Sequence, residues 1–480
     1  MRVIIALLIG FVLICGCRQN QRDNSTFTIA VATQLETAAW KSLPQRLQKI
    51  IPPTFVQQDF YVAQFGAQNS FDIDSRSAIQ QAIDHCHQQG GGRVVLPAGN
   101  YFSNGPLHLK SEVNLHLQSG ATLRFGDDPQ HYLPLVKVRW EGTVCWNWSP
   151  LIYAFRQSNI GLTGAGTIDG NGKRWSTKWR KLQDPEKARL RQMGNDLVPE
   201  DQRVFGNGFL DLDEDGEDDG FGDNTVHYLR PTLVEFYECK NILIDSLSFR
   251  QPPFWTIHPV FCKNVSIRNL QVYGDYLNDD GIDPDSCEDV LIENCYVETH
   301  DDAIAIKAGR DQDAWERSGS RNIIVRNCQL ASGVNAFAIG SEMSGGVEDV
   351  FVENCQLLRG RHGLNFKCNL DRGGQVQNIF LRNILVDTLR DAMFIFRMDY
   401  HGYRGNQFPT KFNDFYASNI RCTAVEKTAF KIVGVKSQPI ERILLRDIKI
   451  DRAETDMELN YCNDLVIDDV RVAGKIPKPQ

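Results

Sequence analysis

The sequence predicts an all-β chain that winds as a parallel β-helix and begins with a short capping helix. A short strand pattern recurs along the chain, and Asn or Asp returns at the same place in most copies. Copies of the pattern begin at Asn159, Asn241, Asn264, Asp289, Asn322, Asp349, Asn378, Asp414, Arg442 and Asp464. Apolar residues alternate within each copy, which is typical of strands. Units this short must stack on one another to bury their apolar faces.

Residues 1–17 have the pattern of an export signal. Arg2 precedes an apolar run that is too short for a comfortable membrane span. The run ends at Ile14-Cys15-Gly16-Cys17, a pattern similar to that of bacterial lipoproteins, in which Cys17 carries the lipid. Cleavage without lipidation is the alternative. We therefore expect an exported outer-membrane lipoprotein that faces the periplasm or the cell surface, with a polar tether and N-terminal extension over residues 18–58.

A helix and a strand begin the catalytic β-helix domain expected over residues 59–475. Apolar residues from Ala78 to Ile83 have helical spacing, and glycines 90–92 separate them from the strand RVVLP. A helix in this position would cover the open end of the coil, where strand edges otherwise lack partners. We expect a single domain, because stacked repeats extend one core rather than divide it.

Two kinds of side chain are expected to stack in successive coils. The first is a ladder at a turn, where each side-chain amide can bond the next coil, formed by Asn269, Asn294, Asn327, Asn354, Asn383 and Asn419. The second is a pair of buried thiol stacks, formed by Cys239, Cys262 and Cys287 and by Cys295, Cys328 and Cys355. The 13 cysteines include no CxxC pair, so a zinc site is unsupported and free thiols are favoured over disulfides.

Two Asp-rich segments are the candidates for catalysis, LNDDGIDPDSC from Leu277 and THDDAIAIKAGRD from Thr299. Asp280 and Asp302 are about one coil apart, so they would lie on neighbouring strands about 4.8 Å apart. Together with Asp301 they would crowd one external face, and their repulsion would raise the pKa of at least one carboxyl. That carboxyl could serve as a general acid while the others activate water. A metal site or a solvated acidic turn is the alternative.

Several other features carry smaller expectations. Calcium-loop spacing appears at Asp211, Asp213 and Asp215, with a solvated acidic loop as the alternative, and no cofactor is required. Packing in the core, rather than sugar stacking, is favoured for Trp140, Trp146, Trp148, Trp175 and Trp179. The net charge of −8 and the lack of a basic run argue against nucleic acid as a partner.

The Asp-rich segments resemble glycoside hydrolase family 28, the polygalacturonase family of pectin-lyase-like β-helices. The family's N-x-D motif matches Asn278-Asp279-Asp280, and its paired aspartates match Asp301-Asp302. Further matches cover nearly the whole mature chain and begin at Tyr61 (YVAQFGA), Gly161 (GLTGAGTIDGNG), Pro253 (PFWTIHP) and Gly340 (GSEMSGG). The resemblance implies a right-handed coil, and hydrolysis with inversion, for which carboxyl groups are about 6.5–9.5 Å apart. It also implies that Asp301 is the general acid and that Asp280 with Asp302 activates water.

The residues expected to contact substrate are Asn278, His300, Lys307, Arg310, Asn365, Lys367 and Arg372. Two family motifs are altered: Val334 stands where the family has the His of Gly-His-Gly, and Asn365 replaces the Arg of Arg-x-Lys. Asn365 lacks the guanidinium that pairs with a sugar carboxylate. We therefore expect weak activity on plain polygalacturonan and better cleavage of rhamnogalacturonan or of oligogalacturonide-type substrates. His362, close to Lys367 in sequence, is expected to be an ordinary surface residue.

These features predict a secreted, monomeric, inverting O-glycosyl hydrolase whose partner is a pectic polysaccharide or oligosaccharide. The membrane is expected to be contacted only through the lipid anchor. A polysaccharide lyase on the same fold is one alternative, and a non-catalytic glycan-binding β-helix is another. The intact set of Asp280, Asp301 and Asp302 favours hydrolysis over both.

Overall fold

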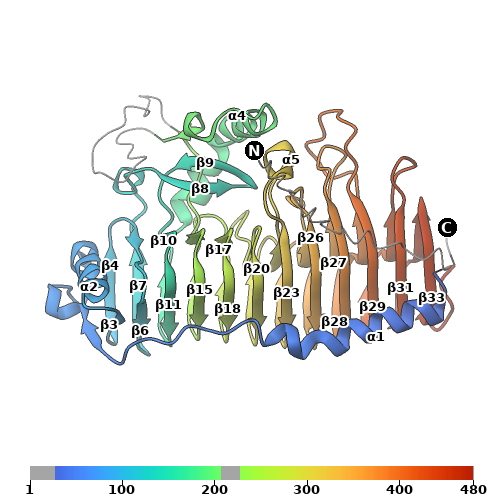
Figure 1. Cartoon of the computed structure of the whole chain (residues 1–480), viewed down its shortest axis with the longest axis horizontal. Coiled ribbons are helices and arrows are strands. Elements are labelled where there is room, and N and C mark those ends of the chain that lie inside the picture. Colours follow the sequence, from blue (N-terminus) through green and yellow to red (C-terminus); the bar gives the residue numbers. More distant parts are fainter. Residues whose placement is uncertain (1–26, 207–226, 479–480) are drawn as a thin grey trace, which may run out of the picture.

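The computed structural model describes residues 27–206 and 227–478, which wind into one right-handed parallel β-helix (Figure 1). Apolar side chains at alternate strand positions point into the coil and form one continuous core along its length. A right-handed sense is nearly universal for crossovers between parallel strands. The predicted fold class is confirmed.

Three rows of parallel strands form the walls of the coil. The first row runs through β1 (Asp59–Tyr61), β3 (Gly92–Leu96), β6 (Val113–Leu117), β11 (Ser158–Gly164), β15 (Lys240–Asp245), β18 (Lys263–Arg268), β20 (Glu288–Glu293), β23 (Ser320–Arg326), β26 (Val347–Glu353), β28 (Gln375–Arg397), β29 (Lys411–Val425), β31 (Ile440–Ile450) and β33 (Cys462–Val472). The second row runs through β2 (Ser70–Asp74), β4 (Gly99–Ser103), β7 (Ala121–Phe125), β12 (Thr167–Asp169), β16 (Ser248–Arg250), β19 (Gln271–Tyr273), β21 (Tyr296–Thr299), β24 (Gln329–Ser332) and β27 (Gln356–Lys367). The third row runs through β5 (Leu107–His108), β10 (Ile152–Phe155), β14 (Val234–Tyr237), β17 (Ile257–Val260), β22 (Ile304–Ile306) and β25 (Asn335–Ile339), and after β27 and β28 it ends in β30 (Thr428–Val433) and β32 (Thr455–Asn460). From β27 onward long strands bend from one wall to the next, so a single strand can belong to two rows.

Asparagines in the left-handed backbone region tie successive coils together. Every member of the predicted ladder has a φ between 51° and 57°, a region that Asn tolerates better than most residues. Asn294 donates to Asn269 at 3.3 Å, and Asn419 donates to Asn383 at 2.7 Å. The asparagine ladder predicted from the repeats is confirmed.

The two predicted thiol stacks lie inside the coil. All six cysteines are buried and unpaired. The Cys262 thiol lies between those of its stack neighbours, and burial raises its pKa well above the usual value. These thiols are therefore packing residues rather than nucleophiles.

The predicted capping helix is α2 (Arg76–Gln88), which covers the N-terminal end of the coil (Figure 1). Its buried face consists of Ala78, Ile79, Ala82, Ile83 and Cys86. The strand expected after the glycines is β3. Among the helices of residues 27–206 and 227–478, none combines the length and apolar character needed to cross a membrane.

The N-terminal extension contains a helix that the sequence did not predict, α1 (Ile29–Leu47). It lies along the outside of the C-terminal coils (Figure 1). Trp40 packs edge-on against Phe351 at 5.3 Å between ring centroids, and the Arg382 guanidinium lies 3.9 Å from the Trp40 ring. The extension is therefore a packed part of the domain from Phe27 onward rather than only a tether.

A second layer covers the N-terminal part of the third row (Figure 1). It consists of the antiparallel hairpin β8 (Val136–Trp140) and β9 (Thr143–Asn147), the short strand β13 (Val204–Phe205), and the helices α3 (Arg180–Leu182) and α4 (Asp184–Asn195). Single turns occur at Val62–Phe65, Pro129–His131, Trp175–Trp179 and Glu200–Gln202. Side chains of this layer form their own apolar cluster with those of β10, β14 and β17. The next coil carries a short helix, α5 (Asp311–Trp315).

Candidate active site

The predicted catalytic carboxylates lie together on the outer side of the third row. Ile282 forms a bridge with Ile304 of β22, so the loop that carries Asp280 and the loop that carries Asp301 and Asp302 belong to adjacent coils. One oxygen from each carboxylate lies within 4.8 Å of the others. The expected spacing of about 6.5–9.5 Å between carboxyl groups is therefore not met by these nearest oxygens, because adjacent coils bring the three side chains closer together.

Two buried lysines neutralise part of this negative charge. Lys367 Nζ lies 2.6 Å from Asp302 Oδ2, and Lys307 Nζ lies 3.4 Å from Asp280 Oδ2. Burial alone would lower the pKa of Lys367, but the Asp302 carboxylate raises it above the usual value, so the ammonium stays charged. Because these lysines supply the counter-charges, the cluster is suited to acid–base chemistry.

The carboxylates differ in their readiness to hold a proton. Burial, together with the Asp302 charge, raises the pKa of Asp301 to about 6. Burial and the neighbouring Asp283 raise the pKa of Asp280 well above its usual value. Asp301 is the partly exposed member of the set, while Asp280 and Asp302 are buried. A carboxyl that is half protonated near pH 6 and accessible from outside fits the role of general acid.

Sequence reasoning overlooked Asp279, which holds the two catalytic loops together. Its buried carboxylate accepts backbone N–H bonds from Asp301 at 2.7 Å, from Tyr276 at 3.0 Å and from His300 at 3.1 Å. The position was visible only as the middle residue of the N-x-D motif. It joins the loop before β22 to the loop one coil earlier.

Arg230 is a second residue that the sequence did not single out. Its buried guanidinium donates to Asn278 Oδ1 at 2.8 Å and to the Leu277 carbonyl at 3.1 Å. Asn278 in turn lies 3.5 Å from Asp301 Oδ2 through its amide nitrogen. The predicted substrate residue Asn278 therefore also contacts the candidate acid. The stretch before β14 carried no motif that could have revealed Arg230.

The altered Gly-His-Gly segment presents Asn335, rather than Val334, to the carboxylates. Asn335 Nδ2 donates to Asp302 Oδ1 at 2.5 Å. Val334 precedes β25 and is only partly buried, so the effective replacement for an imidazole at this site is an amide. The alternation of strand side chains brings Asn335 opposite His362 of β27.

The expectation that His362 is a surface residue is wrong. Its ring is buried, with Nδ1 2.8 Å from Asn335 Oδ1 and Nε2 3.3 Å from Asp391 Oδ2. The register of β27 between β25 and β28 turns the ring into the wall of the coil. Asn365 is also buried and donates to Asn335 Oδ1 at 2.7 Å.

The other predicted substrate residues differ in accessibility. Arg310 Nη1 lies 2.9 Å from Glu342, and Arg372 Nη1 lies 2.5 Å from Asp311, with both arginines buried. Glu342 and Asp311 thus neutralise the charges of the two arginines within the protein. The arginines therefore stabilise the structure around the site rather than face a bound sugar. His300 is exposed next to Asp301, where a bound sugar could reach it.

Aromatic rings border the charged cluster. Phe254 stacks on Trp140 at 5.1 Å and on Trp255 at 5.1 Å, and Lys307 Nζ lies 4.3 Å from the Trp255 ring. Tyr400, also overlooked in the sequence, lies 5.3 Å from Lys367 Nζ. Of the early tryptophans, Trp140, Trp148, Trp175 and Trp179 are buried and Trp146 is partly buried, so they pack in the core as expected.

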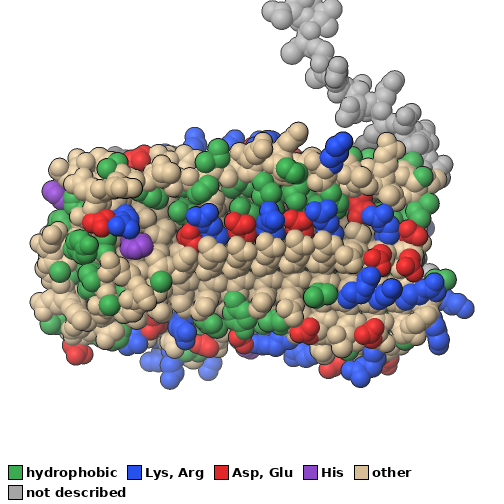
Figure 2. Space-filling view, turned by 90° about the horizontal axis from the view of Figure 1, so that it is seen from below, with side chains coloured by type: hydrophobic (Ala, Val, Ile, Leu, Met, Phe, Trp, Pro, Cys, Tyr) green, Lys and Arg blue, Asp and Glu red, His purple; other side chains and the backbone are tan. Residues whose placement is uncertain are grey.

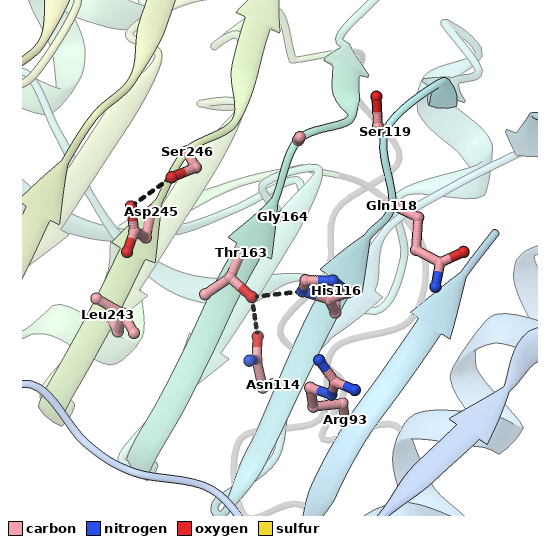
Figure 3. Close-up of a pocket in the computed structure, with 11 residues that line it drawn as sticks. Arg93, Asn114, His116, Gln118, Ser119, Thr163, Gly164, Leu243, Asp245 and Ser246 are labelled. Carbon is pink, nitrogen blue, oxygen red and sulfur yellow. Dashed lines mark hydrogen bonds between the residues drawn. The ribbon is translucent and has the colours of Figure 1, made fainter. Parts of the chain in front are cut away.

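The cavity drawn in Figure 3 lies elsewhere, on the N-terminal coils. It has a volume of about 510 Å³ and contains none of the three catalytic aspartates. Thr163 joins His116 at 2.9 Å and Asn114 at 2.9 Å across adjacent strands (Figure 3). These bonds link neighbouring coils of the first row.

Two predictions fall outside the described residues. The lipidation site Cys17 belongs to residues 1–26, and the calcium-type loop with Asp211, Asp213 and Asp215 belongs to residues 207–226. Both stay predictions.

A parallel β-helix with clustered acid and base carboxylates on its outer wall is the framework of a polysaccharide-cleaving enzyme. The family model for glycosyl hydrolases family 28 matches residues 202–471. The chain belongs to this family and is a glycosyl hydrolase of polygalacturonase type. Membership in this family of hydrolases excludes the two alternatives, a polysaccharide lyase and a non-catalytic glycan-binding protein.

Similar proteins extend over most of the chain. The crystal structure of a hyperthermoactive exopolygalacturonase from Thermotoga maritima has a TM-score of 0.81 and 31% identity, covering 91% of this chain and 97% of that one. A probable polygalacturonase of Vitis vinifera is 26% identical over 423 residues, which is 84% of this chain and 76% of the relative. The exo-poly-alpha-D-galacturonosidase of Dickeya chrysanthemi is 26% identical over 452 residues, covering 88% and 73% respectively.

Proposed function

We propose that the protein is an exo-acting hydrolase that removes sugars from the end of a galacturonate chain. The observation that carries this proposal is the cluster of Asp280, Asp301 and Asp302 beside two buried lysines. Asp301 protonates the leaving oxygen, while Asp302 deprotonates a water on the other side of the bond and Asp280 helps to orient that water. The sugar centre is then inverted.

An acidic substrate suits the charges around this cluster. Besides Lys367, the partly exposed Arg397 lies close to Tyr400, with its guanidinium 5.7 Å from that ring. Burial lowers the pKa of Arg230, and the positive charge of the nearby Arg180 lowers it further. Cations on several sides of the carboxylates favour a uronate over a neutral sugar. Position 365 lacks the family's Arg, but these cations can pair with the sugar carboxylate in its place. The proposed substrates are therefore polygalacturonan and its oligosaccharides.

The layer over β10, β14 and β17 supports action at a chain end. Arg139 of β8 is buried and lies 2.9 Å from Asp285, and Trp140 stacks on Phe254. These contacts fix the hairpin over the outer face of the third row (Figure 1), and its turn reaches the coil after Asp302, where the Gly142 carbonyl accepts from the Arg310 backbone N–H at 2.9 Å. A polysaccharide crossing that face would meet the hairpin, so only the chain end fits. The name of the Thermotoga maritima relative agrees with this mode of action.

The test compares polygalacturonan, oligogalacturonides and rhamnogalacturonan as substrates. We expect short galacturonate products from the first minutes, with little loss of polymer viscosity, and a β anomer at the newly released end. Asp301→Asn should lower turnover by about 100- to 10,000-fold. Asp275→Asn, at an exposed residue of the neighbouring loop that carries Asp280, is the matched control.

Each part of the proposal has its own contrary result. A ladder of mixed lengths with rapid viscosity loss would contradict exo action. Preference for rhamnogalacturonan would contradict the proposed substrate, an α anomer would contradict inversion, and an Asp301→Asn variant of normal activity would remove Asp301 from the mechanism.

We also propose that the enzyme is exported and anchored through a lipid on Cys17. The support is the apolar N-terminal run followed by the Ile14–Cys17 pattern. The unmodified protein should partition into detergent, and Cys17→Ser should release it into the soluble fraction. An unmodified protein that is soluble after processing would be inconsistent with the anchor.

A further inference from the structure

A hydrogen-bonded chain of buried side chains connects His362 with the candidate base Asp302. His362 Nδ1 lies 2.8 Å from Asn335 Oδ1, and Asn335 Nδ2 lies 2.5 Å from Asp302 Oδ1. His362, Asn335 and Asp302 are all buried. On its other side the His362 ring faces Asp391, which is 27% exposed and whose Oδ2 lies 3.3 Å from Nε2.

The chemistry of these groups fixes the direction of each bond. A carboxylate only accepts, so Asn335 must direct its NH₂ group toward Asp302. Its carbonyl oxygen then faces His362 and Asn365, and both must donate to it. The proton of His362 must therefore be on Nδ1.

The surroundings of His362 agree with a neutral ring. Burial lowers the pKa of His362 to about 4, and the opposing effect of Asp391 is smaller. The charged groups nearby are Asp391, its ion-pair partners Arg361 and Lys427, and Arg397. A neutral ring with its proton on Nδ1 has no donor at Nε2. This accounts for the longer distance of 3.3 Å between Nε2 and Asp391 Oδ2.

We propose that His362 is a positioning residue for hydrolysis, acting through Asn335 to hold Asp302 as a water-activating base. If the Asn335 side chain turned over, its oxygen would face the Asp302 carboxylate, and repulsion would move that carboxylate. The Nδ1–H of His362 and the amide of Asn365 oppose this turn. This inference rests on the proposed function, because it assumes that Asp302 helps to activate water.

The experiment compares His362→Leu, which has no donor, with His362→Asn, whose amide nitrogen can occupy the place of Nδ1. In His362→Leu we expect kcat on polygalacturonan to fall about tenfold, with KM changed less than about twofold. The acidic limb of the pH profile should move to higher pH, because a weaker bond to the ionised Asp302 favours its protonation. His362→Asn should recover most of kcat and the original limb.

His116→Leu is the matched control. His116 is partly buried and bonded to Thr163 in the cavity of Figure 3, away from the carboxylates. It should leave kcat, KM and the acidic limb unchanged. Melting temperatures of the three variants separate loss of folding from loss of positioning.

The result that would overturn the inference is a His362→Leu enzyme with the kcat and acidic limb of the unmodified protein. Equal losses in His362→Leu and His362→Asn, with no shift of the limb, would also overturn it. If the unmodified protein cleaves none of these substrates, the proposed function is wrong, and the kinetic comparison no longer tests the role of His362. Nitrogen NMR of His362 still tests the inference, since a neutral Nε2–H tautomer at about pH 5–8 would lack the required Nδ1–H donor.

Discussion

At the residue scale, the catalytic geometry depends on polar residues that take no part in the reaction. Asp279 accepts three backbone N–H bonds and thereby holds Asp301 against the loop of Asp280. Burial raises the pKa of Asp279, while those three bonds lower it. A neutral amide in its place would present an NH₂ group to backbone donors. The spacing of the carboxylates therefore depends on a buried residue outside the set of Asp280, Asp301 and Asp302.

The sequence revealed the charged residues of the site but not their support. Asp280, Asp301 and Asp302 could be predicted because strand repeats align them on adjacent coils. Arg230 and Tyr400 could not, because they approach from loops whose paths no repeat pattern describes. The prediction that His362 lies on the surface was wrong. The sequence does not show where the long strand β27 bends, and so does not show which side chains the bend buries.

At the element scale, α1 illustrates what the repeat pattern leaves out. The period that buries Ala32, Glu36, Trp40 and Leu43 is helical. This spacing did not indicate an amphipathic helix in the sequence, because one residue of the buried face is the charged Glu36. The buried charge of Glu36 is explained by the strands on which α1 packs. The sequence of the helix alone does not reveal these strands.

Those strands carry alternating charges along one face of the coil. By register the ladder runs through Asp245, Arg268, Glu293, Arg326, Glu353, Arg382, Ser418, Arg446 and Asp468. Figure 2 shows an alternation of basic and acidic side chains along the molecule. Ser418 breaks the alternation between two arginines. Glu36 of α1 fills the gap, 2.5 Å from Ser418 Oγ and 2.5 Å from Arg446 Nη2.

Replacing Glu36 should therefore release α1. Glu36→Ala leaves Arg446 without its carboxylate and opens a buried polar gap, which we expect to cost about 1–3 kcal/mol. Limited proteolysis should cut between Phe27 and Ile50 sooner in this variant. Gln34→Ala, on the exposed side of the same helix, is the control and should behave like the unmodified protein. Equal proteolysis of all three proteins would show that Glu36 does not hold the helix.

At the scale of the whole molecule, two carboxyls of the active site lower the stability of the fold near neutral pH. The folded-state pKa values of Asp301 and Asp283 are both raised to about 6, with burial as the main cause. These two carboxyls therefore bind more protons in the folded protein than in the unfolded chain between about pH 4 and pH 6. Their contribution to the free energy of unfolding falls as pH rises through that range, and it stays lower above it.

Asp301→Asn should consequently stabilise the protein at pH 7 while it lowers turnover. The amide cannot ionise, so the variant avoids a cost on the order of 1–3 kcal/mol at neutral pH. For a chain of this size that corresponds to a melting temperature higher by about 1 °C per kcal/mol. Near pH 4 the carboxyl is largely protonated in the folded protein, and the difference should shrink toward zero. Scanning calorimetry at both pH values, with Asp275→Asn as control, measures the effect. A gain of equal size at both pH values would mean that ionisation of Asp301 is not its source.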